Sequence, residues 1–152
     1  MPARIARRRS ALCLATVAAL GLVAAGCSSD DGGGTVEVTL QEFAVIPAPG
    51  SISSGEVSFE VTNEGPDDVH EFVVFQTDLA PDALPTVEDG SVDEEGEGLE
   101  LIDEIEDMAV GDSETLTVSL DAGSYALICN IYDADEQESH YQEGMRVAFT
   151  VE

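Results

Sequence analysis

The sequence predicts an all-β domain over residues 35–152, folded as a Greek-key β-sandwich of seven to eight strands. Short runs in which apolar and polar residues alternate are typical of strands with one buried face. Clusters of Gly, Pro, Asn and Asp separate these runs and predict turns. About 118 residues is the usual size of a two-sheet sandwich, and little of the segment has a helical period.

The first expected strand covers residues 36–41, where Val and Leu alternate with Glu, Thr and Gln, and it extends as far as Val45. The next segment, 46–50, contains two prolines and is expected to end the strand pairing and connect to the following strand. A second alternating run over 56–62 predicts the next strand. Residues 63–68 (Asn-Glu-Gly-Pro-Asp-Asp) predict a turn.

In residues 69–77, apolar side chains occupy both odd-numbered and even-numbered positions, as expected of a central strand that is covered on both faces. His70 shares its parity with apolar residues and lies near the start of this strand. The segment 78–107 is the least regular, and its acidic run is expected to be a solvated loop. Within it, 83–87 is expected to form a short helix and 101–105 to begin another strand.

Alternating runs over 115–120, 125–129 and 145–151 predict three more strands. A tight turn at 121–123 leads into the second of them, and a polar, acidic loop joins the last two. Because the chain has no Trp, aliphatic and Phe side chains must fill the core. The phenylalanines expected there are Phe43, Phe59, Phe72, Phe75 and Phe149.

Residues 1–26 have the features of an export signal. They contain four of the five basic residues and no acid, and their apolar run is shorter than the roughly 20 residues of a membrane-spanning helix. The run ends in Ala-Ala-Gly before Cys27, which resembles a bacterial lipobox. We therefore expect lipidation of Cys27, a flexible tether over 27–34, and an extracytoplasmic protein anchored to the cell membrane. The other interpretation is an ordinary secretory peptide that happens to end near a cysteine.

The body of the protein is strongly acidic. Beyond residue 26 the chain has one Arg, no Lys and all 32 acidic residues, a net charge of 1 − 32 = −31. Nucleic acid and anionic membrane surfaces are therefore not expected as partners of this body. A positively charged partner protein fits this charge, and so does a simple solvated surface suited to high salt.

One cysteine, Cys129, lies within the expected domain, so an intradomain disulfide is excluded. It is either a buried inert thiol or a metal ligand. His140 and Met145 follow it near the ends of the last two strands, and a thiolate, an imidazole and a thioether make a soft site. Two imidazoles, a thiolate and a weak axial thioether are the ligands of blue copper. The only other histidine in the chain is His70.

This part of the chain resembles the cupredoxins, a family of small copper-binding β-sandwich proteins. Secreted bacterial members end in the pattern C-N-x-x-G-H-Y-x-x-G-M. The matching residues here are Cys129, Asn130, His140, Tyr141, Gly144 and Met145. The resemblance covers roughly 35–152. It implies one type 1 copper ion bound by His70, Cys129 and His140, with Met145 as the axial ligand.

Two departures from the family pattern concern this site. Ten residues separate Cys129 from His140, where the pattern has four. The longer connection affects the expected rigidity of the loop and the tuning of the potential. Glu71 follows His70, where plastocyanin and azurin have Asn, so the bond that steadies the ligand loop is expected to differ.

The resemblance implies transfer of single electrons between partner proteins, such as a cationic cytochrome or an oxidase, with His140 as the electron port because a loop carries it. An enzyme is not expected, because multicopper enzymes need further histidines and both are already assigned to this site. Two alternatives stay open. One is a lipoprotein that binds or delivers copper without redox chemistry, which the long loop favours somewhat. The other is a metal-free sandwich that contacts proteins.

Overall fold

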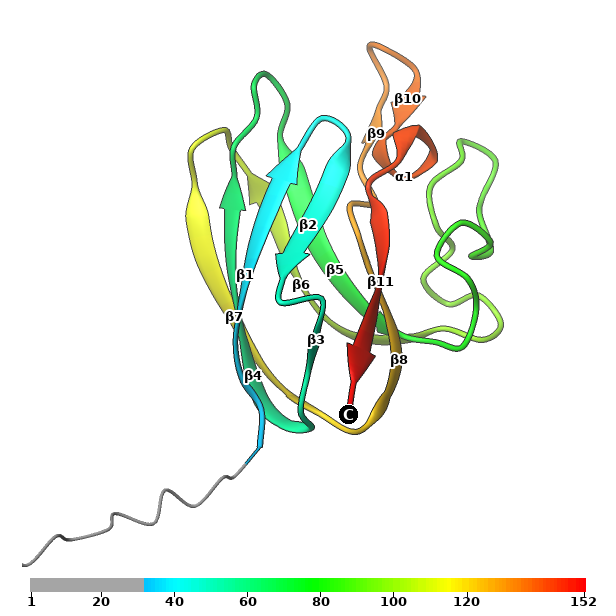
Figure 1. Ribbon diagram of the computed structural model, residues 1–152. Helices are drawn as coiled ribbons and strands as arrows, with labels where there is room; N and C mark the ends of the chain where they lie inside the picture. The colour runs from blue at the N-terminus through cyan, green and yellow to red at the C-terminus, as the bar shows by residue number, and fades with distance from the viewer. Residues whose placement is uncertain (1–31) are drawn as a thin grey trace, which may run out of the picture.

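The computed structural model describes residues 32–152, which form two β-sheets packed face to face (Figure 1). The expected export signal, Cys27 and most of the expected tether lie outside the described residues. The last three tether residues, 32–34, are joined to the sheets, because Gly33 N donates to Ser53 O (3.2 Å) and Gly34 begins the first strand. The ordered domain therefore begins slightly before residue 35.

The first sheet has the order β2-β1-β4-β7. Its strands are β1 (Gly34–Gln41), β2 (Ala44–Ala48), β4 (Gly55–Asn63) and β7 (Ser113–Leu120). β1 and β4 run parallel in the centre, and β2 and β7 are antiparallel edges. In β1 and β4, buried apolar residues alternate with more exposed polar residues, so one face of this sheet covers the core.

The expected course of the chain through 43–50 is wrong. The first strand does not extend to Val45; the chain turns after Gln41 and returns as β2, which pairs antiparallel with β1. Pro47 does not break this pairing. β2 is an edge strand, so a residue without an N–H group is tolerated on its unpaired side.

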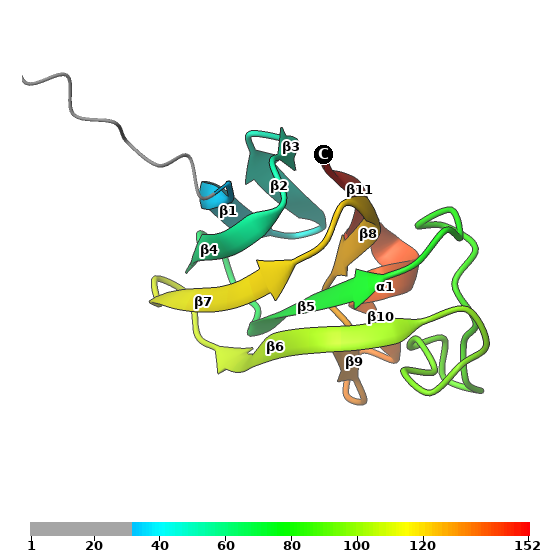
Figure 2. The same ribbon diagram turned by 90° about the horizontal axis from the view of Figure 1, so that it is seen from below.

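The second sheet has the order β3-β11-β8-β5-β6. Its strands are β3 (Ser51–Ile52), β5 (His70–Gln76), β6 (Glu100–Met108), β8 (Gly123–Ile128) and β11 (Arg146–Val151). Figure 2 shows β5 and β6 side by side in one layer and β4 and β7 in the other. Eight strands of the described chain have five or more residues, which confirms the expected sandwich of seven to eight strands.

β5 is the covered central strand that the sequence predicted. Phe72 and Val74 point into the core between the sheets, where Phe59 contacts the rings of Phe72 and Phe149. The alternate residues of β5 belong to a second buried cluster on the outer face of the sheet. That cluster consists of Val73, Phe75, Leu84, Val92, Ala126, Ile128 and Tyr141.

The segment 77–99 covers this outer face (Figure 1). Its acidic run is solvated, as expected, because Asp93, Glu95 and Glu97 are exposed. The short helix expected over 83–87 is absent; an isolated bridge joins Thr86 to Val92. Pro85 explains the difference, because it lacks an N–H group and disfavours helical geometry at Leu84. Leu84 and Val92 instead anchor the segment to the sheet by burial.

The connection between β8 and β11 is folded. It forms a short hairpin of β9 (Tyr132–Asp133) and β10 (Glu138–Ser139), followed by one helical turn, α1 (His140–Glu143). In the described part of the chain, no helix has the length and apolar character needed to cross a membrane.

Candidate metal centre

The pairing of β5, β8 and β11 brings the predicted ligands to one end of the second sheet. His70 begins β5, Cys129 directly follows β8, and β8 is antiparallel to both β5 and β11. The start of β5 therefore lies beside the end of β8. The backbone N–H of Cys129 donates to Met145 O (3.0 Å), and Met145 N donates to His140 O (3.0 Å). All four predicted residues thus meet at this end.

Three of these residues present donor atoms to one another. His70 Nδ1 and His140 Nδ1 lie 3.2 Å apart, and Cys129 Sγ lies 3.5 Å from His140 Nδ1 and 4.0 Å from His70 Nδ1. Their exposed fractions are 0% for His70 and Cys129 and 2% for His140. Met145 is also fully buried, within the apolar core.

These separations fit a single metal ion. Ligand nitrogens lie about 2.0–2.1 Å and thiolate sulfur about 2.3 Å from an ion such as zinc, so ligands spread around it are roughly 3.3–3.8 Å apart. The three observed separations are close to that range. The thiol is a soft donor, imidazoles suit transition metals, and the group contains no carboxylate, which disfavours Mg²⁺ and Ca²⁺.

The protonation of the centre also suits a metal. Burial raises the pKa of the Cys129 thiol to about 12, so the metal-free protein keeps it protonated at neutral pH. Burial, and next the neighbouring His140, lower the pKa of His70, which keeps its imidazole neutral. Neutral imidazoles are the form that binds metals, and a bound ion would replace the thiol proton.

Glu71 forms a bond to the ligand loop in place of the family's Asn. Its carboxylate Oε1 accepts from Asn130 N (2.9 Å), and its own backbone N–H donates to Cys129 Sγ (3.4 Å). Burial raises the pKa of this carboxyl to about 7. Glu71 therefore links the start of β5 to Asn130, the residue that follows the cysteine. A carboxylate makes this bond here, so the bond differs from that of an Asn, as the sequence led us to expect.

The segment 77–99 holds the connection between Cys129 and His140 near both of its ends. Next to the cysteine, Asn130 Oδ1 accepts from Val92 N (2.5 Å) and Asn130 Nδ2 donates to Val92 O (3.1 Å). Next to the histidine, the Tyr141 hydroxyl donates to Pro81 O (2.8 Å) and accepts from Leu84 N (3.1 Å). The long connection is therefore not loose.

Sequence reasoning did not find these contacts. The signal that could have pointed to them is the position of Asn130 and Tyr141, each directly after a candidate ligand in the family pattern. Gly144 of the same pattern has a structural reason: its φ is +134°, and a Cβ there would lie 3.1 Å from Phe43 O.

The structure places His140, the expected electron port, beneath the surface, and its role in electron transfer stays a prediction. The imidazole is 2% exposed. The partly exposed Phe43 ring packs edge-on against it, with centroids 5.3 Å apart, and the His70 ring lies on another side at 5.1 Å. A loop carries His140, but the folded connection turns the ring inward.

Removal of the Tyr141 hydroxyl should destabilise the fold. In Tyr141→Phe the buried N–H of Leu84 loses its acceptor, so we expect the free energy of unfolding to fall by about 1–3 kcal/mol. Urea unfolding of the metal-free protein measures this change. The matched control is Tyr132→Phe, whose hydroxyl has no hydrogen bond within the described residues and should change stability by less than about 0.5 kcal/mol. Equal losses in the two variants would contradict the role given to Tyr141.

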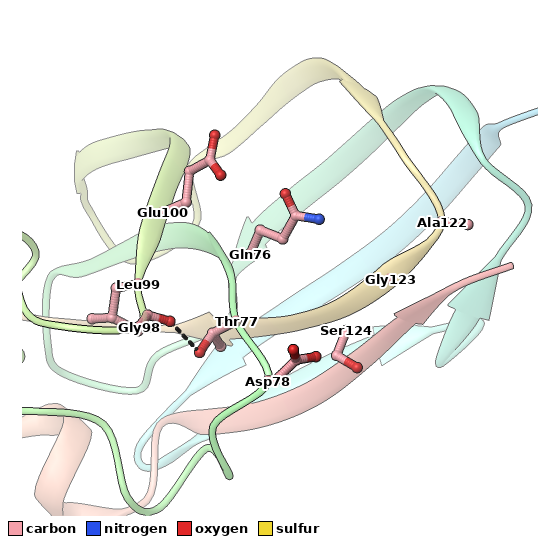
Figure 3. A pocket seen from close by; sticks show the side chains of 9 residues that line it. All are labelled: Gln76, Thr77, Asp78, Gly98, Leu99, Glu100, Ala122, Gly123 and Ser124. Atoms are coloured by element: carbon pink, nitrogen blue, oxygen red, sulfur yellow. Dashed lines mark hydrogen bonds between the residues drawn. The ribbon is translucent and has the colours of Figure 1, made fainter.

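A separate open pocket of about 540 Å³ lies at the other end of β5 (Figure 3). It is lined by Gln76, Asp78, Glu100 and Ser124, among others, and Thr77 Oγ1 donates to Gly98 O (2.7 Å) across one wall. Gln76 ends β5 whereas His70 begins it, so this pocket is distinct from the centre.

Comparison with known proteins supports the fold. No family model and no curated protein matches the sequence. Among solved structures, a reduced auracyanin from Roseiflexus castenholzii is 20% identical, with a TM-score of 0.55 over 78% of this chain and 96% of that one. Auracyanin A from Chloroflexus aurantiacus, described as a "blue" copper protein, is 18% identical, with a TM-score of 0.52 over 80% and 100%.

Rusticyanin from Thiobacillus ferrooxidans is 17% identical, with a TM-score of 0.50 over 78% of this chain and 76% of that one. These likenesses show that the described chain has the cupredoxin fold, which confirms the fold that the sequence resemblance implied.

Proposed function

We propose that this protein holds one type 1 copper ion through His70 Nδ1, Cys129 Sγ and His140 Nδ1, with Met145 as the weak axial ligand, and that it carries single electrons. The observation that carries the proposal is the convergence of two imidazoles and a thiol within 4.8 Å of one another at a buried end of the sandwich. Bound copper would supply the one-electron couple.

The protein's part is to hold the donors in one arrangement. Thiolate and thioether suit Cu(I), and imidazole suits both oxidation states. The donors lie at the ends of paired strands, and the connection between them is bonded to the segment 77–99. Such a centre needs little rearrangement when an electron arrives or leaves. Because His140 is covered, we propose that electrons cross the layer that contains Phe43.

Delivery of copper is the second candidate, and the long loop was its main support in the sequence. The bonds of Asn130 and Tyr141 favour a rigid loop, and the burial of all the donors leaves none exposed for transfer to another protein. Both observations favour electron transfer. A metal-free sandwich is disfavoured because it has no need of two imidazoles and a thiol in an apolar interior.

We further propose that the protein works outside the cytoplasm as a lipoprotein anchored through Cys27, and that it is a carrier and not an enzyme. The apolar leader that ends at this cysteine supports the anchor, and the assignment of both histidines to one site supports a carrier. A cationic redox protein, such as a cytochrome or an oxidase, suits the net charge of −31 beyond residue 26 (1 − 32).

Voltammetry of the copper-loaded full chain tests the proposal. We expect one reversible one-electron couple with one copper per chain. In Met145→Leu the copper and its colour should remain, while the potential should rise because the lost axial donor stabilises Cu(II). Release of copper on reduction would favour delivery instead. An unchanged potential in Met145→Leu would mean that Met145 is not a ligand of the copper.

A further inference from the structure

Two buried polar side-chain atoms of the described residues have no hydrogen-bond partner, and they belong to neighbouring groups: His70 Nε2 and Glu42 Oε2. An unpaired buried polar group costs free energy, so such a pair calls for a physical reason. His70 Nε2 lies on the side of the ring away from Nδ1, the atom that faces Cys129 and His140.

Glu42 is fixed in the turn between β1 and β2. Its Oε1 accepts from the backbone N–H groups of Asp67 (3.1 Å) and Asp68 (2.7 Å) and lies 3.6 Å from His70 Nε2. The Glu42 side chain is only 13% exposed. The separation exceeds a hydrogen bond, and a small rotation that brings the unbonded Oε2 toward the ring would close it.

We propose that Glu42 is a positioning residue whose carboxylate accepts the Nε2–H of His70 and so holds the Nδ1 lone pair toward the metal. The second part of this inference, an effect on copper, rests on the proposed function. Metal-binding histidines commonly donate their other ring N–H to a carboxylate or a carbonyl, which fixes the tautomer and makes the imidazole a stronger donor.

The charge of Glu42 supports this role. Its Oε1 accepts from the backbone N–H groups of Asp67 and Asp68, and such bonds stabilise the carboxylate form beside the buried ring. A negative charge there stabilises Cu(II) more than Cu(I), so Glu42 should hold the potential down.

The first test uses metal-free full-length protein and needs no copper. Ring ¹⁵N chemical shifts report the tautomer of His70, and we expect the proton on Nε2. In Glu42→Gln the amide can still accept from Asp67 and Asp68, but its NH₂ faces the ring. The ratio of the Nε2–H to the Nδ1–H tautomer should fall roughly tenfold or more. Glu60→Gln, which removes one exposed charge on the outer face of β4, is the matched control and should leave the ratio unchanged.

The second test is the midpoint potential of the copper-loaded proteins. Glu42→Gln should raise it relative to Glu60→Gln, and a tenfold loss of preference for Cu(II) corresponds to about 59 mV. A His70 proton on Nδ1 in the parent, or equal tautomer ratios and potentials in the two variants, would overturn the inference. Failure to bind copper, with the tautomer shift intact, would instead overturn the proposed function alone.

Discussion

Replacement of Cys129 by Ser is expected to abolish the copper-dependent visible absorption completely. Cys129 supplies the only thiol among the described residues, and intense absorption requires charge transfer from a thiolate to copper. A serine hydroxyl fits the same buried space but does not give up its proton near neutral pH. We also expect the affinity for copper to fall by roughly 100-fold, since a soft ligand is lost. Optical spectra during titration with copper measure both effects.

The control for this variant lies in the same chain. Cys27→Ser replaces a cysteine outside the described domain, so purified protein with this change should keep the full absorption. An intense visible band in Cys129→Ser, or its loss in Cys27→Ser, would place the thiolate ligand elsewhere.

Truncation of Phe59 should destabilise the protein more than any change at the surface. The ring is fully buried between the sheets and lies 5.2 Å from Phe72 and 5.6 Å from Phe149, measured between centroids. Phe59→Ala leaves a cavity where β4 meets the second sheet, and such changes cost about 3–5 kcal/mol. Urea unfolding of the metal-free protein measures this loss.

Ile46→Ala is the matched control for Phe59→Ala. Ile46 is 45% exposed on the edge strand β2, so its truncation should change stability by less than about 0.5 kcal/mol. A loss below about 1 kcal/mol in Phe59→Ala would mean that the two sheets are not held together by this aromatic contact.

Periodicity allowed most of the fold to be predicted. Alternation in 36–41 and 56–62 marks the half-buried strands β1 and β4, and the doubly apolar run 69–77 marks the covered β5. Periodicity does not report pairing partners. The return of the chain as β2 was therefore missed, and Pro47 suggested a break where an edge strand tolerates it.

The candidate ligands could be predicted because the chain has few soft donors. The cupredoxin resemblance implies two imidazoles, one thiolate and one thioether, and the domain has one thiol and two histidines to match them. The surroundings of the site could not be predicted, because they depend on contacts across distant parts of the chain. Glu42 reaches His70 from the β1–β2 turn. The Tyr141 hydroxyl donates to Pro81 O, and these two residues are 60 positions apart in the sequence. The inward position of His140 follows from the same packing.

The optical and spin-resonance spectra of the full chain loaded with one equivalent of copper test the central claim most directly. The account predicts intense thiolate-to-copper absorption together with a small copper hyperfine splitting, because two imidazoles and one thiolate hold the ion in a rigid, dry site. A pale protein with the large splitting of ordinary Cu(II), or no binding of copper at all, would contradict it.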